Sequence, residues 1–406
     1  ITIAGSSTLY GIHVSTASTA TRQAYNNTIS DFTGGTGTTY GLSFQTCSSQ
    51  QVYNNSVSNI TAGGTTYGLY FSGNNPTVYN NTVSNITTAG QNLAGIYDQG
   101  AQTTNCYKNQ VFNLTSTYSG ASTMTVCGIQ VLSGTVGNYV YNNFISDIKV
   151  PNATVTTNAL FGINASASGA TTKIRLYYNT VYLSSTGSGY KSYGIFSNSG
   201  HIAELRNNIV VNTSGGNAVA YGRSSNIFGT YSVASDNNDF YATNIFHDGT
   251  TYYTTMADYQ TLVYPREQAS FSENPPFINA AIAPYDLHIN TGTATQIERG
   301  GRPVTTPIAI TDDFEGNTRD ASFSDLGADE FSGTVLDLTA PIIAYTPFAN
   351  TSSLSDRTLV VNISDQAGVP TTAPGWPNLY WKKGILGTYT AVQPTSVSGS
   401  DYTFNF

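Results

Sequence analysis

Apolar and polar residues recur in a fixed order along the first 240 residues. The clearest copies are residues 51–60 (QVYNNSVSNI) and 77–86 (TVYNNTVSNI), in which a Tyr-Asn-Asn triplet stands between apolar residues. We define the second asparagine of the triplet as position zero. It recurs eight times, at intervals of 26 to 36 residues, as Asn27, Asn55, Asn81, Asn109, Asn143, Asn179, Asn208 and Asn238. A repeat of this length predicts a solenoid.

The apolar residues beside each zero asparagine predict a bend in the backbone. In one copy they are Val78, three places before it, and Val83, two places after it. Side chains alternate between the faces of a straight strand, so residues five apart would point in opposite directions. Both can reach one core only if the chain turns between them, and asparagine tolerates the left-handed conformation of a corner. We predict that the zero asparagine turns this corner, and that stacked amides pair between coils as an asparagine ladder.

A glycine landmark lies between successive copies of the motif. An aromatic or small residue, a glycine and an aliphatic residue recur around Gly11, Gly41, Gly68, Gly95, Gly128, Gly162 and Gly194. A polar column also stands four places after position zero: Asp31, Asn59, Asn85, Asn113, Asp147 and Asn212. Each repeat therefore predicts a strand, an asparagine corner, a second strand, an Asx turn and a glycine-led strand. Parallel strands wound in this way form a β-helix, and eight coils at about 4.8 Å each would extend roughly 40 Å.

This repeat resembles the right-handed parallel β-helix repeat of pectate-lyase-like proteins, including their asparagine ladder, over about residues 1–243. The resemblance implies a fold but no single activity, because this fold serves lyases, hydrolases, phage tailspikes and adhesins. The expected fold class is all-β: a right-handed parallel β-helix solenoid of about eight coils with a C-terminal cap, then a partial immunoglobulin-like β-sandwich.

Three domains are expected from changes in pattern: β-helix repeats at 1–245, a cap of the β-helix at 246–333 and an immunoglobulin-like module at 334–406. The cap contains APYDLHI (283–289), TDDFEGNTRD (311–320) and DLGADEF (325–331), which together resemble the closing segment of bacterial secreted β-helix proteins. The last module is short for a sandwich of about 100 residues. We therefore expect it to be truncated and the chain to be a segment of a longer protein.

Composition narrows the function classes. Charged residues make up 9% of the 406 residues, against about 25% in typical domains. A net charge of −8 argues against nucleic acid, which needs clustered cations. No apolar run reaches the length of a membrane span. Polarity with few charges favours an extracellular or cell-surface protein. The three cysteines, Cys47, Cys106 and Cys127, cannot all pair within the chain and are interpreted as small apolar core residues.

Candidate catalytic chemistry is sparse. Six acids fall within residues 1–243, scattered over different coils: Asp31, Asp98, Asp147, Glu204, Asp236 and Asp239. Lys173 and Arg175 form the best basic pair on one strand. We therefore predict no catalytic residue, no metal ligand and no cofactor. The acidic run Asp312, Asp313, Glu315, Asn317 and Asp320 offers Ca²⁺ ligands, but a solvated acidic turn is the preferred interpretation.

Tyrosines supply the candidate binding surface. The residue two places before position zero forms a column of Tyr25, Tyr53, Tyr79, Tyr107, Tyr141 and Tyr177. Their rings could pack against a polysaccharide, or against one another to stabilise the rod; packing is the preferred interpretation. Longer segments at 115–125 and 150–158 form a second candidate surface, because insertions in solenoids often border the binding face.

Three functions are open at this point. The first is a non-catalytic extracellular surface or adhesin-type structural protein, with a polysaccharide or cell-surface glycan as its partner along the β-helix face. The second is a polysaccharide lyase or glycoside hydrolase of β-helix fold. The third is a self-associating subunit of an extracellular fibre, built by pairing of free strand edges. The first is preferred.

Overall fold

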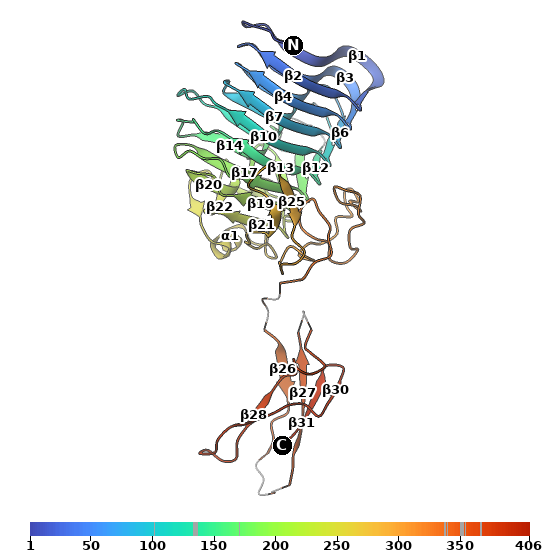
Figure 1. The fold of residues 1–406 in the computed structure, drawn as a ribbon, viewed down its shortest axis with the longest axis vertical. Coiled ribbons are helices and arrows are strands. Elements are labelled where there is room, and N and C mark those ends of the chain that lie inside the picture. The colour runs from blue at the N-terminus through green and yellow to red at the C-terminus, as the bar shows by residue number, and fades with distance from the viewer. Residues whose placement is uncertain are drawn as a thin grey trace. The chain divides into compact units, whose positions relative to one another are not determined.

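The computed structural model describes residues 1–100, 102–132, 137–169, 171–336, 338, 340–349, 353, 355–365 and 368–406, with only the backbone for 16–18. It divides into two compact units, Ile1–Thr334 and Val335–Phe406. The first unit is all-β apart from short helices, and its strands wind into a parallel solenoid of about eight coils (Figure 1). This confirms the predicted fold class for the first unit.

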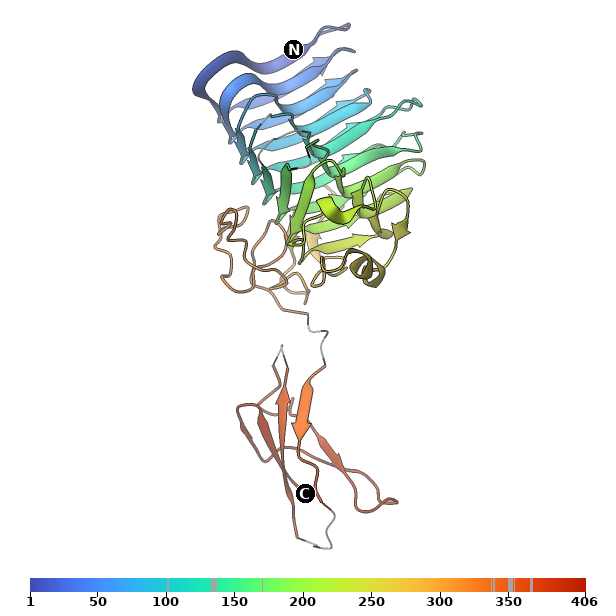
Figure 2. The same cartoon turned by 180° about the vertical axis from the view of Figure 1, so that it is seen from behind.

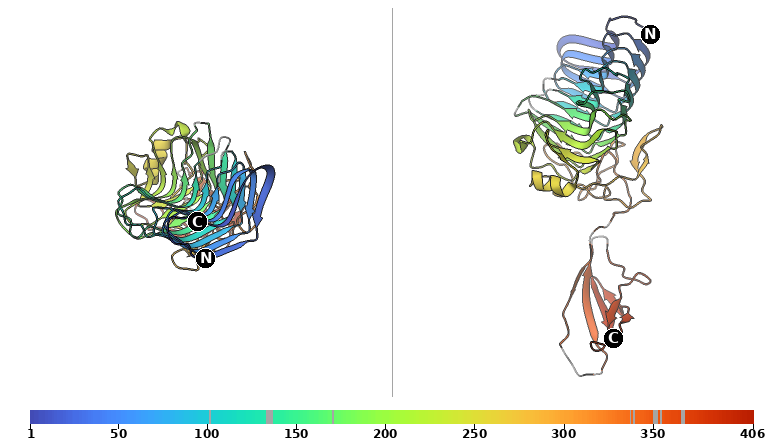
Figure 3. Two further views of the ribbon diagram at one scale, coloured as in Figure 1. Left: turned by 90° about the horizontal axis from the view of Figure 1, so that it is seen from above. Right: turned by 90° about the vertical axis from the view of Figure 1, so that its left-hand side faces the viewer.

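Each coil contributes strands to two parallel sheets, which Figure 3 (left) views along the stack. The strands that follow the Tyr-Asn-Asn motif form an eight-stranded sheet: β2 (Thr28–Gly34), β4 (Ser56–Ala62), β7 (Thr82–Thr88), β10 (Gln110–Ser116), β13 (Phe144–Lys149), β16 (Thr180–Leu183), β19 (Ile209–Asn212) and β21 (Asp239–Ala242). The other strands form a fifteen-stranded sheet with two arms.

The glycine-led arm of the larger sheet comprises β1 (Leu9–Tyr25), β3 (Thr39–Tyr53), β5 (Thr66–Phe71), β8 (Asn92–Asp98), β11 (Thr125–Val131), β14 (Asn158–Ala165), β17 (Lys191–Ser197), β20 (Asn217–Arg223), β22 (Asn244–His247) and the antiparallel β23 (Tyr252–Tyr253). The second arm leads into the corner and comprises β6 (Pro76–Tyr79), β9 (Thr104–Tyr107), β12 (Asn138–Tyr141), β15 (Lys173–Tyr177) and β18 (Ile202–Arg206). The long strands β1 and β3 run through both arms.

The core explains why the motif and the glycine landmark occur together. Val78 and Val83 are both buried, as the parity argument requires. A Cβ atom added to Gly68 would lie 2.4 Å from Cγ1 of Val83. The equivalent glycine meets the equivalent aliphatic residue in the other coils, so glycine is needed where the glycine-led strand crosses the side chain of the opposite sheet.

The corner is turned by the residue before the zero asparagine, so the predicted corner position is wrong by one residue. Left-handed φ angles of 52–57° occur at Asn26, Asn54, Asn80, Lys108, Asn142, Tyr178, Asn207 and Asn237. The polar column is also left-handed from Asp31 to Asp147, with φ angles of 53–64°. These residues lie inside strands such as β4, so they bend a strand and do not separate two strands as predicted.

The zero asparagines point inward and link the coils. The backbone N–H and the Nδ2 group of Asn55 donate to Oδ1 of Asn81 over 3.0 and 2.9 Å, and Nδ2 of Asn81 also donates to the carbonyl of Val52. The same pair of bonds joins each zero asparagine to the next, from Asn27 to Asn238. We call this set the asparagine column.

Residues 246 and 247 still belong to the parallel strand β22, and the chain after it packs over the last coils and along the side of the solenoid. Helix α1 (Met256–Val263) buries Tyr259 and Val263 against the last coils, with Tyr259 and Phe246 ring centroids 4.4 Å apart. The short helix η1 (Phe228–Thr230) lies nearby in the chain. The hairpin of β24 (Phe277–Asn279) and β25 (Asp286–Ile289) packs beside Phe144 on the outside of the eight-stranded sheet.

Residues 300–328, which we call the strap, lie beside the later coils of the solenoid (Figure 2). The side-chain amides of Asn142, Asn207 and Asn237 donate to carbonyls of Asp312, Arg302 and Gly300. Arg319 is almost completely buried, and its guanidinium lies 3.8 Å from the ring centroid of Tyr178. The strap therefore covers the corners of the later coils, whereas the equivalent corners of the first three coils, at Asn26, Asn54 and Asn80, are exposed.

The second unit contains two small antiparallel sheets. One consists of β26 (Ile342–Tyr345), β27 (Thr358–Ser364), β31 (Asp401–Asn405) and β30 (Ser396–Ser398); the other consists of β28 (Leu379–Trp381) and β29 (Thr390–Val392). Leu359, Val361, Ile363, Tyr402 and Phe404 form its core. Among the residues described in either unit, no helix has the length and apolar character needed to cross a membrane.

Candidate functional site

Five of the six tyrosines in the predicted binding column form a closed stack. Neighbouring rings from Tyr25 through Tyr53, Tyr79 and Tyr107 to Tyr141 have centroids 4.8–5.0 Å apart and planes inclined by only 3–8°. Tyr177 is buried instead and donates its hydroxyl to Glu204 over 2.6 Å.

This geometry limits what the stack can bind. Sugar C–H groups pack against the negative face of an aromatic ring, and each internal ring has both faces covered by its neighbours. Tyr25 lies at one end of the stack, and this residue is 48% exposed. Burial raises the pKa of Tyr79 and Tyr107, which fits hydroxyls lying along a packed edge. The arrangement favours a stabilising role for these rings.

A second set of tyrosines lies outward on the glycine-led arm, and sequence reasoning gave it no binding role. We call Tyr10, Tyr40, Tyr67, Tyr70 and Tyr97 the aromatic face. Their rings are half-buried and mostly tilted, with 79° between Tyr40 and Tyr70 and 51° between Tyr67 and Tyr97. Tilted rings leave parts of their faces uncovered. In the sequence, this face is indicated by tyrosines directly before a landmark glycine or two places after it.

Two hollows continue the aromatic face along the arm. The first, of about 160 Å³, is lined by Tyr67, Tyr97, Asn92, Leu93, Thr125 and Gln130. It exists because Ala94 and Cys127 occupy the register positions of Tyr67 in the next two coils. Small side chains there leave space beside the rings, while the amides of Asn92 and Gln130 supply hydrogen-bonding groups.

The second hollow, of about 460 Å³, shares Thr125 with the first. Its lining includes Phe161 and Phe196 together with Asn164 and Lys191. Residues Thr123–Thr125 and Thr156–Asn158 also line it, and these come from the two longer segments predicted as the second candidate surface. The structure therefore brings these segments together beside the aromatic rings.

The candidate catalytic groups lie apart from the hollows. No carboxylate lines either hollow among the described residues. Asp98 is buried and accepts hydrogen bonds from Thr104 and Gly100, and burial raises its pKa to about 6. Asp147 pairs with Lys149 over 2.8 Å.

The basic pair on β15 is also divided between two environments. Lys173 is exposed, whereas Arg175 is buried. The guanidinium carbon of Arg175 lies 5.0 Å from the ring centroid of Tyr139. Glu204 lies opposite Arg175 in the strand register, a carboxylate neighbour that the sequence had not revealed. Glu204 already accepts a hydrogen bond from the Tyr177 hydroxyl. Strands β15 and β18, which carry these residues, lie on the other arm of the larger sheet from the strands that line the hollows.

The acidic run that offered Ca²⁺ ligands separates into different roles. Asp312 pairs with Lys108 over 2.6 Å. Asp313 is buried and accepts from the backbone of Gly316 and Asn317, while Asp320 accepts from backbone N–H groups just after it. These contacts order the turn and do not gather the carboxylates at one point.

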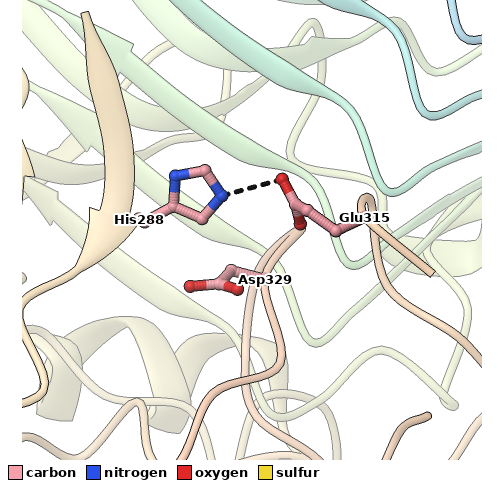
Figure 4. A group of neighbouring side chains, drawn as sticks. All are labelled: His288, Glu315 and Asp329. Carbon is pink, nitrogen blue, oxygen red and sulfur yellow. Dashed lines mark hydrogen bonds and ion pairs between the residues drawn. The ribbon is translucent and has the colours of Figure 1, made fainter. Parts of the chain in front are cut away.

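One acid of this run, Glu315, meets two residues from distant segments (Figure 4). Its carboxylate lies 2.8 Å from Nε2 of His288, whose Nδ1 lies 2.5 Å from Asp286. Hydrogen bonding to Glu315, followed by that to Asp286, raises the pKa of His288 to about 9. Asp329 completes the group, and burial raises the pKa of its carboxyl to about 6. The sequence identified the three segments as a closing signature but could not show their convergence.

Comparison of the chain with protein-family models, with curated proteins and with solved structures found no match. The resemblance to pectate-lyase-like repeats therefore rests on the repeat pattern alone.

Proposed function

We propose that this chain is a non-catalytic, extracellular surface protein of adhesin type that binds a polysaccharide on the glycine-led arm. The observation that carries the proposal is the aromatic face of half-buried tyrosine rings continuing into two hollows that combine aromatic rings with side-chain amides and lack a described carboxylate. Aromatic rings beside a small number of polar groups are the usual lining of a ligand-binding site.

The chemistry of the hollows suits a glycan laid across several coils. Tyr67 and Tyr97 offer ring surface in the first hollow, and Asn92 and Gln130 can each donate and accept hydrogen bonds with sugar hydroxyls. Lys191 places a cation in the second hollow, which would favour a sugar carrying a carboxylate or sulfate there. Cleavage would need paired carboxylates or an activated base, and the lining provides neither.

The wider context supports the same proposal. The β-helix repeat resembles that of secreted proteins, and the antiparallel sheets of the second unit are compatible with an immunoglobulin-like spacer module. In this arrangement the solenoid presents the binding surface and the second unit serves as a spacer.

A glycan array probed with the whole chain tests the proposal. Tyr67→Ala and Gln130→Ala should each weaken binding to the glycans recognised by the unmodified chain by at least about tenfold, a loss of about 1.4 kcal/mol. Tyr79→Ala in the closed stack is the matched control and should bind normally. Loss with Tyr79→Ala but not with Tyr67→Ala would place recognition on the stack and overturn our assignment.

Two further measurements address the other functions. Product release from acidic and neutral polysaccharides, abolished by Lys173→Met or Asp147→Asn, would show a lyase or hydrolase. A mass that rises with protein concentration in light scattering would indicate a fibre subunit. We expect neither result.

A further inference from the structure

Three segments that are far apart in the chain bring ligand-forming atoms to one point. His288 comes from β25, Glu315 from the strap and Asp329 from the loop that follows it. One ligand atom from each residue lies within 4.8 Å of the others, and Figure 4 shows the imidazole bonded to Glu315 with the Asp329 carboxylate beside the ring. Among the described residues this is the one such group of three. It lies outside the aromatic face and its hollows.

The charge at this point is unbalanced. Asp286, Glu315 and Asp329 surround one imidazole, and the buried carboxylate of Asp313 adds repulsion at Asp329. Even a fully protonated His288 neutralises only one of these negative charges. The nearby Arg319 is engaged with Glu330 over 3.0 Å. A bound cation would therefore be favoured by the remaining charge.

The orientation of His288 provides a further observation. Asp286 engages Nδ1, so Nε2 is directed at Glu315. Metal-binding histidines are commonly held in this way, with one nitrogen bonded to an outer carboxylate and the other directed at the ion. Asp286 precedes His288 by two residues on β25, which places both side chains on one face of the strand.

The group is also accessible. A cavity of about 430 Å³ borders it and is lined by His288, Asp286, Tyr285, Phe144 and Ser146, among others. His288 is 36% exposed on its side chain. An ion could enter from this cavity, and water could fill a remaining coordination position, as in zinc sites that have three protein ligands.

We propose that His288 Nε2 and the carboxylates of Glu315 and Asp329 form a divalent metal site for Zn²⁺, with Asp286 holding the histidine in position. One nitrogen and carboxylate oxygens suit Zn²⁺ better than Ca²⁺, which takes oxygen ligands. The ion replaces the His288–Glu315 ion pair, and it joins the hairpin of β24 and β25 to the strap. The bound ion would therefore hold together the hairpin and the strap, the two segments that pack on the outside of the later coils.

Calorimetric titration of the chelator-treated whole chain with ZnCl₂ tests the site. We expect one Zn²⁺ per chain, with affinity reduced at least about tenfold in Glu315→Gln and in Asp329→Asn. Asp286→Asn should bind about 10- to 100-fold more weakly, because an outer carboxylate is lost. Asp320→Asn, an exposed acid of the same strap, is the matched control and should retain full affinity.

A second readout separates a metal site from a purely structural cluster. Zn²⁺ should raise the Tm of the unmodified chain but not that of Glu315→Gln, and Co²⁺ should give a visible absorption band that His288→Gln abolishes. Circular dichroism before metal is added establishes that each variant is folded. Zn²⁺ affinity equal in all variants, or no saturable binding to the unmodified chain, would overturn the proposal and leave an ion-pair cluster.

Discussion

Neighbouring asparagines of the Tyr-Asn-Asn motif occupy different environments. Asn80 is exposed and adopts a φ angle of 54°, whereas Asn81 is buried and its amide bonds to three backbone or side-chain groups. The first asparagine is there for its backbone conformation and the second for its side chain. Substitutions at the two positions should therefore have effects of different size and cause.

Asn81→Ala should lower the free energy of unfolding by about 3 kcal/mol, because it removes the side-chain donor to the Val52 carbonyl and the acceptor of the buried Asn55 backbone N–H. Asn80→Ala should cost only about 1 kcal/mol, the penalty for a left-handed alanine, and Asn80→Gly should be nearly neutral. Urea unfolding measures all three. Equal losses at both positions would contradict the division of roles.

Glu267 terminates the asparagine column and should make stability depend on pH. It accepts from Nδ2 of Asn238 over 2.9 Å and from the Tyr231 hydroxyl, and burial raises its pKa to about 7. Between pH 4.5 and pH 7 the unfolded carboxyl ionises while the folded one keeps its proton. The free energy of unfolding should therefore fall as pH rises through this window, by about 3 kcal/mol for a shift of this size.

Glu267→Gln tests this contribution, since it has no proton to lose. Urea unfolding at pH 5 and pH 8 should show a smaller pH dependence in the variant than in the unmodified chain. Asp31→Asn, which changes an exposed carboxylate, should leave the difference unchanged. An unaltered pH dependence in Glu267→Gln would mean that this carboxyl is ionised in the folded protein throughout.

At the scale of the strand, spacing predicted the coil but not the faces of its tyrosines. Apolar residues five apart required a bend, and the parity rule placed Val78 and Val83 in the core. The bend could not be assigned to one asparagine, because either member of the pair tolerates a left-handed backbone. Likewise, a column of tyrosines predicts proximity, but closed stacking depends on rotamers set by the strand twist and neighbouring rings.

Gly68→Ala tests the contact between strands. The new Cβ would lie 2.4 Å from Val83 and 2.6 Å from the carbonyl of Gly95, and overpacking of this kind costs about 3 kcal/mol. Gly229→Ala is the control, because a Cβ there meets nothing within 4 Å. Thermal unfolding of the two variants should show a large fall in Tm for the first and little change for the second. Similar Tm values would contradict the close approach of the sheets.

At the scale of the first unit, the strap unites groups that sequence spacing could not connect. Arg319 contacts Asn142 across 177 positions in the chain, and the approach of Glu315 to His288 depends equally on the path of the whole strap. The repeat predicted each coil because its signals are local and recur eight times. The strap occurs once, so no periodicity revealed which corners it would cover.

Arg319→Met should detach the strap. It leaves Glu330 unpaired and removes donors to Asn142 and Gly327, and breaking a buried ion pair typically costs about 3–5 kcal/mol. Lys108→Met breaks the more exposed pair with Asp312 and should cost no more than about 1 kcal/mol. Limited proteolysis should cut residues 300–328 faster in Arg319→Met alone. Equal protection in both variants would show that other contacts hold the strap.

The seven equivalent steps of the asparagine column have a consequence for how this protein can evolve. Each asparagine of the column offers its Oδ1 atom as acceptor to the coil before it, and its backbone N–H and Nδ2 group as donors to the coil after it. An in-frame duplication of residues 55–80 would therefore create an additional coil whose upper and lower neighbours already match it. Rod length becomes a property that can change by whole units in a single genetic event, while the terminal helix and strap are inherited intact.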